Sequence, residues 1–111
     1  MNKYQQRAMK TKGKYIDNTD QLIDGVMGLN GEAGEVIDTV KKYLYQGHDL
    51  NQMNLLEELG DCLWYITLCT DALGVKLETI AELNISKLKR RYPEGFSIED
   101  SILRRDKWWC I

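Results

Sequence analysis

Apolar residues recur along most of the chain at steps of three and four positions, which is the repeat of an α-helix. Such repeats predict helices over about residues 4–12, 20–45, 50–73 and 77–92. Gly47, Gly74 and Pro93 follow the last three of these segments, and both residue types commonly end helices. No stretch alternates with a period of two, so we expect no β-sheet.

Each of the three longer helices carries one apolar stripe, which we predict to face the core. In the helix over 20–45 the stripe is Leu22, Val26, Leu29, Ala33, Val36, Ile37, Val40 and Leu44. The next helix presents Leu55, Leu59, Cys62, Leu63, Ile66, Cys69 and Leu73, and the last presents Leu77, Ile80, Ala81, Leu83, Asn84 and Leu88. Short connections make neighbouring helices antiparallel, so the expected fold is all-α, a four-helix-type bundle.

With 111 residues the chain has the size of one domain, and nothing in it reads as a linker. We expect a single domain over 1–111, with a core over about 4–104 and a tail over 105–111. Trp108 and Trp109 in this tail leave three alternatives open: packing on the bundle, a subunit contact or disorder. Because a small bundle has a limited core, we expect self-association as a homodimer or homotetramer.

The composition of the chain argues against several classes of function. The net charge of -2 provides no basic field, so we expect no nucleic-acid partner. The 3 cysteines, Cys62, Cys69 and Cys110, have no metal-ligand spacing, and we interpret them as buried thiols in a reducing compartment. No apolar run is long enough to span a membrane, and the N-terminus has no signal-like core. We therefore expect a cytoplasmic protein without a membrane partner.

Two acidic pairs are the most specific feature of the sequence. Glu32 and Glu35 lie in GEAGEVID, and Glu58 and Asp61 lie in EELGD. Within each pair the spacing is i, i+3, which places two carboxylates one turn apart on one helix face. Both faces lie to the side of the apolar stripes, where a carboxylate can point into a groove of the bundle.

Four converging carboxylates repel one another unless a cation neutralises them. Oxygen ligands favour Mg²⁺, or Mn²⁺ as a substitute, and Mg²⁺ in proteins commonly also binds substrate phosphates. The sequence therefore predicts a magnesium site that takes a polyphosphate ligand. The simpler alternative is that these are ordinary surface acids, which two coincident pairs make less attractive. A di-iron site needs Glu-x-x-His pairs, and the one histidine, His48, lies in a predicted loop.

Glycines recur every third residue through the second predicted helix, at Gly25, Gly28, Gly31 and Gly34. Each costs roughly 0.5 to 1 kcal/mol relative to alanine inside a helix. This run indicates the close approach of a neighbouring backbone or of a nucleotide. The alternative is that the helix breaks near residues 25–28.

Other polar residues could hold the substrate. Lys87 and Arg91 lie one turn apart and could bind a triphosphate, although cations near a helix C-terminus are also favoured by the helix dipole alone. Asn84 would extend this polar face by one turn. Tyr65 shares the face of the second acidic pair, although aromatic residues in bundles more often belong to a core.

Taken together, GLNGEAGEVIDTVKK, EELGDCLWYI and NISKLKRRYPEGFS resemble the MazG-like nucleotide pyrophosphohydrolases. The resemblance covers most of the chain before the tail and presents the three blocks in the family's order. It implies an all-α enzyme that hydrolyses nucleoside triphosphates to the monophosphate and pyrophosphate with magnesium. It also implies metal ligation by the four acids and a substrate-binding role for Tyr65, Asn84, Lys87 and Arg91.

The catalytic base is expected to be Glu32 or Glu35, and the residues leave this choice open. Glu57 competes with Glu58 as a ligand, because it lies i, i+4 from Asp61, but the family's spacing favours Glu58. Two other functions remain as alternatives: a helical regulator that binds nucleotides without cleaving them, and a phosphatase that releases orthophosphate.

Overall fold

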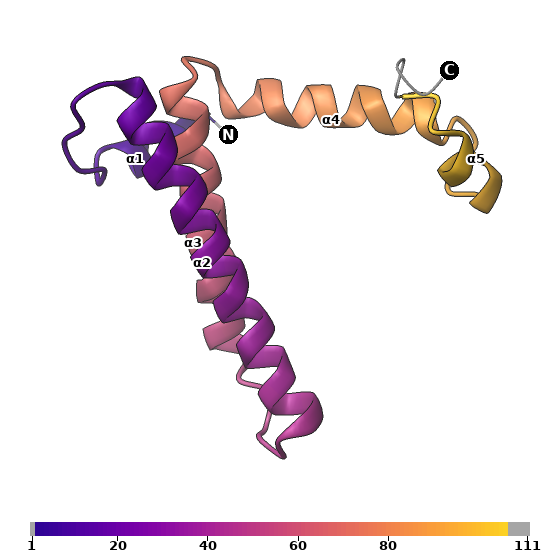
Figure 1. Cartoon of the computed structure of the whole chain (residues 1–111), viewed down its shortest axis with the longest axis horizontal. Coiled ribbons are helices and arrows are strands. Elements are labelled where there is room, and N and C mark those ends of the chain that lie inside the picture. The colour runs from indigo at the N-terminus through magenta and orange to yellow at the C-terminus, as the bar shows by residue number, and fades with distance from the viewer. Residues whose placement is uncertain (1, 107–111) are drawn as a thin grey trace. The chain divides into compact units, whose positions relative to one another are not determined.

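The computed structural model describes residues 2–106, and helices dominate this part of the chain (Figure 1). These helices are α1 (Asn2–Met9), α2 (Asn18–Tyr45), α3 (Gln52–Ala72), α4 (Leu77–Arg91) and α5 (Ile98–Leu103). Strand-like pairing within the described residues is limited to an isolated bridge between Pro93 and Gly95. The all-α prediction is confirmed, and α5 lies in a region for which the sequence predicted no helix.

The chain divides into two compact units, Met1–Lys76 and a second that begins at Leu77. Helices α1 to α3 belong to the first unit, whereas α4 and α5 belong to the second. The four-helix bundle and the single domain therefore stay predictions. No helix within 2–106 is long and apolar enough to cross a membrane.

Local signals set the ends of α2 and α3. The side chain of Asp17 caps α2 by accepting a hydrogen bond from the backbone N–H of Asp20 at 2.8 Å. Beyond the other end of α2, Gly47 adopts a φ of 73°, which glycine tolerates better than other residues. Asn51 caps α3 in the same way as Asp17 caps α2. Because α2 is continuous from Asn18 to Tyr45, the alternative of a break near 25–28 is wrong.

Helices α2 and α3 form an antiparallel hairpin, and Figure 1 shows them side by side. Two contacts define their register. The ring of Tyr65 lies over Gly28, and farther along the hairpin Thr39 accepts a 3.4 Å hydrogen bond from Asn54. Each step forward on α2 is thus matched by a step backward on α3.

The face of α2 that meets α3 differs from the predicted core stripe. Gln21 and Gly25 are the buried residues of α2, whereas Val26, Ile37 and Leu44 are 50%, 67% and 59% exposed. Across the described residues the buried hydrophobic side chains are Ala8, Leu68, Ala72 and Leu77. The predicted core stripe of α2 is therefore only partly buried within one chain, because Leu22, Leu29, Val36 and Val40 are half-buried and its other members are exposed. The glycines beside the stripe let α3 approach closely.

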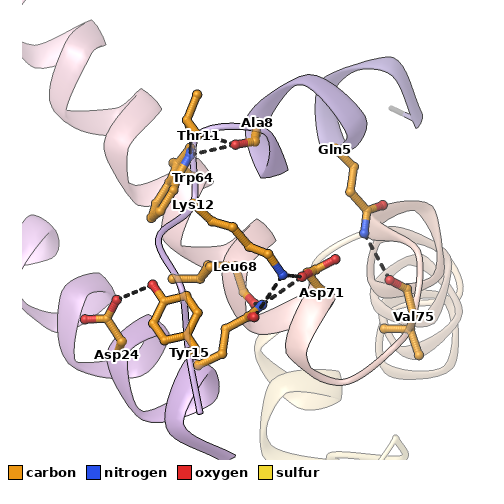
Figure 2. A network of polar contacts seen from close by, with 11 residues as sticks. Gln5, Ala8, Thr11, Lys12, Tyr15, Asp24, Trp64, Leu68, Asp71 and Val75 are labelled. Carbon is orange, nitrogen blue, oxygen red and sulfur yellow. Dashed lines mark hydrogen bonds and ion pairs between the residues drawn. The ribbon is translucent and has the colours of Figure 1, made fainter. Parts of the chain in front are cut away.

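A polar network closes the open end of the hairpin (Figure 2). The ammonium of Lys12 bonds Asp71 at 2.6 Å and Gln21 at 3.0 Å, and Gln21 also donates to Asp71 and to the carbonyl of Leu68. Partial burial acts to raise the pKa of Asp71, but the hydrogen bonds from Lys12 and Gln21 outweigh it and lower that pKa. The network ties the segment after α1 to both long helices.

Helix α1 is attached to α3 by a tryptophan. The indole N–H of Trp64 is shared between the carbonyl of Ala8, at 3.3 Å, and the hydroxyl of Thr11, at 2.8 Å (Figure 2). A second attachment is the bond from Gln5 to the carbonyl of Val75, at 3.1 Å. These bonds place one side of α1 against the middle of α3.

The predicted buried thiols are only partly buried. Cys62 and Cys69 are free thiols of intermediate exposure, so full burial is wrong for both. Burial nevertheless raises the pKa of the Cys69 thiol, which keeps it protonated at neutral pH. Cys110, Trp108 and Trp109 lie outside the described residues.

Two glycines of α2 give a matched test of the hairpin. A Cβ at Gly28 would lie 2.1 Å from the ring of Tyr65, whereas a Cβ at Gly31 would have nothing within 4 Å. Gly28→Ala should destabilise the protein by about 1 to 3 kcal/mol through overpacking. Gly31→Ala should stabilise it by about 0.5 to 1 kcal/mol through helix propensity. Urea unfolding measures both, and equal stabilisation by the two substitutions would contradict the Tyr65 packing.

Candidate metal and nucleotide site

The two acidic pairs lie on the faces through which α2 and α3 meet. Gly28 of α2 faces Tyr65 of α3. Because the two helices are antiparallel, the next facing positions lie four residues later on α2 and four residues earlier on α3. Three residues later on α2 and three residues earlier on α3 lies a second pair of facing positions. The facing pairs are then Glu32 with Asp61, and Glu35 with Glu58. The register therefore places the four predicted ligands on facing turns of α2 and α3.

Glu32 is the carboxylate most affected by this arrangement. Partial burial raises its pKa above the ordinary 4.5, and the negative charges of Asp61, Glu35 and Glu58 raise it further. All three other acids of the predicted site therefore lie close enough to oppose the ionisation of Glu32. A cation among them would relieve this repulsion.

Glu58 is held by two polar neighbours. One carboxylate oxygen accepts a bond from the hydroxyl of Thr39 at 2.8 Å, and the other accepts from the amide of Asn54 at 3.2 Å. These bonds direct Glu58 toward α2, while the adjacent Glu57 is exposed. Thr39 and Asn54 were not among the site residues predicted from the sequence. Their polar side chains, spaced at three- and four-residue steps from the acids on the same faces, were the available signal.

Lys42 is a cation close to the acids. Its ammonium pairs with Asp38 at 3.0 Å, one turn earlier on α2. That hydrogen bond is the main reason why the pKa of Lys42 is raised, and the charges of Glu35 and Glu58 add to the shift. Lys42 thus lies at the edge of the acidic cluster, but its direct partner is Asp38.

The donor set fits a hard divalent cation, because all four candidate ligands are carboxylates. Within residues 2–106, however, no three acidic, histidine or cysteine side chains converge closely enough to form a metal-binding group. The other three carboxylates thus oppose the ionisation of Glu32 without forming a coordination shell. This is the arrangement expected of like charges that repel one another.

The structure gives the predicted substrate residue Tyr65 a packing role. Its ring covers Gly28, which explains the glycine there, and its edge meets Trp64 with ring centroids 5.1 Å apart. Gly25 is similarly close to Cys69, whereas Gly31 and Gly34 have open space at the Cβ position. Half of the glycine run is therefore explained by the approach of α3.

The other predicted substrate residues lie in the second unit, so the structure does not place them relative to the acids. Asn84 is exposed and Lys87 is partly buried on α4. Arg91 makes a two-bond ion pair with Asp106, at 2.7 and 2.8 Å. Hydrogen bonding to Arg91 holds the pKa of the buried Asp106 carboxyl well below its usual range. Arg91 therefore links the end of α4 to the segment after α5.

The predicted loop position of His48 is confirmed. This residue is exposed between α2 and α3, and its backbone N–H donates to the carbonyl of Lys42 at 3.2 Å. The backbone of His48 thus helps to end α2, as expected for the residue after a left-handed glycine.

Fold and site together define an all-α protein whose antiparallel helix pair carries two facing pairs of acids. The chain belongs to the MazG nucleotide pyrophosphohydrolase domain family, whose model matches residues 25–96. The Gene 37 protein of Mycobacterium phage L5 is 37% identical over 83 residues, which cover 71% of this chain and 73% of that protein. No solved structure gives a significant match. Family membership implies nucleotide pyrophosphohydrolase activity.

Proposed function

We propose that this chain hydrolyses nucleoside or deoxynucleoside triphosphates to the monophosphate and pyrophosphate, with Mg²⁺ held by Glu32, Glu35, Glu58 and Asp61. The observation that carries the proposal is the facing of the two acidic pairs across the α2–α3 hairpin, with Glu32 under the influence of the other three charges. Mn²⁺ should substitute for Mg²⁺, since both favour oxygen ligands. The proposed role is nucleotide house-cleaning or pool control in the cytoplasm.

The four acids have different roles in the proposed mechanism. Bound Mg²⁺ supplies charge neutralisation for the phosphate oxygens and makes a coordinated water more acidic. Glu32 or Glu35 accepts the proton of the attacking water, as a general base. Glu58 keeps one orientation because Thr39 and Asn54 bond both of its oxygens. That preorganisation supports a ligand role for Glu58, since fixed ligands need not be reordered when substrate binds.

Substrate contacts are assigned to Tyr65, Asn84, Lys87 and Arg91. Lys87 carries the cation best suited to the phosphates, because the guanidinium of Arg91 already bonds Asp106. Arg91 would then position this end of α4 as well as add positive charge near the phosphates. Tyr65 would fix the α3 backbone next to Asp61 through its packing on Gly28.

The position of cleavage tests the proposal. Cations held by Glu32, Glu35, Glu58 and Asp61 would stabilise pyrophosphate as a leaving group, which favours attack at the α-phosphorus. Hydrolysis in oxygen-18 water should therefore label the nucleoside monophosphate and leave pyrophosphate unlabelled, as read by mass spectrometry. Label in orthophosphate, together with a diphosphate product, would instead support the phosphatase alternative. Magnesium-dependent nucleotide binding without turnover would support the non-catalytic regulator.

Self-association through the exposed face of α2 is part of this proposal. An apolar groove of about 430 Å³ follows the last turns of α2, lined by Val36, Ile37, Val40, Lys41, Leu44 and Tyr45. A second copy is the proposed occupant, because it carries the same apolar face and a two-fold pair would cover both grooves at once. The assembly would be a homodimer or a homotetramer, in which the predicted stripe becomes a core between chains.

A further inference from the structure

A second groove lies in the first unit, between α1 and α3, and borders the acidic cluster. Its volume is about 510 Å³, and its lining residues are Lys3, Tyr4, Arg7, Ala8, Thr11 and Trp64. This volume falls within the range of small-molecule sites. The α1 residues that line it precede the segment matched by the family model, which begins at residue 25.

The walls of the groove suit a flat aromatic ligand. Trp64 and Tyr4 contribute two aromatic rings, and Ala8 adds a small apolar surface. The indole of Trp64 is fixed, because its N–H is bonded to both Ala8 and Thr11. A fixed aromatic side chain offers a stacking surface that loses little entropy when a base binds.

The groove is adjacent to the proposed metal site on two counts. Trp64 follows Asp61 by three residues on α3, so the two side chains leave the helix on one face about 4.5 Å apart along its axis. Tyr4 of α1 also lies near Asp61, because burial and then the negative charge of Asp61 raise the pKa of its hydroxyl. A nucleotide whose phosphates lie at the acids would thus have its base within reach of this groove.

The polar groups of the groove are mainly hydrogen-bond donors. Lys3 and Arg7 carry only donors, and neither has a direct ion-pair partner within residues 2–106. The hydroxyl of Thr11 already donates to Ala8 and accepts from Trp64. Donors pair with the exocyclic carbonyl oxygens and bare ring nitrogens of bases. Arginine pairs well with the O6 and N7 atoms of guanine, whereas adenine places an amino donor at the position of O6.

We propose that the α1–α3 groove binds the nucleobase and that Arg7 and Lys3 select guanine and uracil or thymine, which carry a carbonyl at C6 or C4, over adenine and cytosine, which carry an amino group at that position. This inference rests on the proposed function, because it takes a nucleoside triphosphate as the substrate. A phosphate is a poorer occupant, since aromatic and aliphatic carbon forms most of the wall.

Substrate discrimination by the full chain tests this assignment. The kcat/KM values for GTP and UTP should exceed those for ATP and CTP by about tenfold or more. Arg7→Ala should remove most of this preference by raising KM for GTP and UTP, with kcat nearly unchanged. Lys10→Ala is the matched control, because Lys10 is an exposed cation of the same segment that does not line the groove. Equal rates for all bases, or an unaltered preference in Arg7→Ala, would overturn the assignment.

Binding without catalysis separates this inference from the proposed function. GMP should quench the tryptophan fluorescence of the full chain more strongly than AMP at equal concentration. Trp64→Phe should remove this difference, which assigns it to Trp64 rather than to Trp108 or Trp109, while circular dichroism verifies the helical content of the variant. If no triphosphate is hydrolysed but this difference is present, the proposed function fails and the base site stands. If triphosphates are hydrolysed but GMP leaves the fluorescence of Trp64 unchanged, the base site fails and the proposed function stands.

Discussion

Asp61→Asn is expected to reduce kcat/KM by roughly three orders of magnitude, equivalent to about 4 kcal/mol of transition-state stabilisation, while helical content stays near wild type. Asn keeps the shape of the side chain but removes the negative charge that a divalent cation requires. Folding should not suffer, because Asp61 is exposed and its charge opposes the ionisation of Glu32. Steady-state kinetics at saturating Mg²⁺, with circular dichroism, provide the measurement.

Glu57→Gln is the matched control for this substitution. Glu57 is an exposed acid of α3 next to Glu58, but it is absent from the charges that raise the pKa of Glu32. Its replacement should leave kcat/KM within about twofold of wild type, as expected for an exposed acid outside the site. Full activity of Asp61→Asn at saturating Mg²⁺, or loss of activity in Glu57→Gln alone, would show that the metal site has been assigned to the wrong acids.

Ile37→Glu is expected to convert the proposed homo-oligomer to monomers. In one chain this isoleucine is 67% exposed and lines the apolar groove of α2. Burying such a side chain in an interface contributes about 1.5 to 3 kcal/mol, and an unpaired carboxylate there adds a desolvation cost. The dissociation constant should rise by about a hundredfold or more. Sedimentation velocity over a range of protein concentrations measures the change.

Gln46→Glu provides the corresponding control, because it introduces the same charge at the C-cap of α2, outside the residues that line the groove. This variant should retain the wild-type assembly. A wild-type protein that is already monomeric at micromolar concentration would exclude the proposed α2 interface. An Ile37→Glu protein that still associates would locate the interface on another surface.

The helices could be predicted from the chain because their signals are local. Asp17, Asn51, Gly47 and Gly74 lie where caps and stops are needed, and helix formation depends on residues three and four positions apart. α5 was missed because its 6 residues are too short a segment to show a helical repeat of apolar positions. The acidic pairs could be predicted for the same local reason, because residues at i and i+3 lie on one face of any α-helix.

The sequence by itself determined the helical class, the ends of α2, α3 and α4, and the four candidate ligands, because each depends on a pattern within one helix. Only the tertiary structure decided which face of α2 meets α3. Hydrophobicity favoured the stripe that includes Val26 and Ile37, yet the contact is made through Gln21 and Gly25. The reason is steric: glycines allow the close approach that brings Tyr65 onto α2, and this approach sets the register that faces the acids.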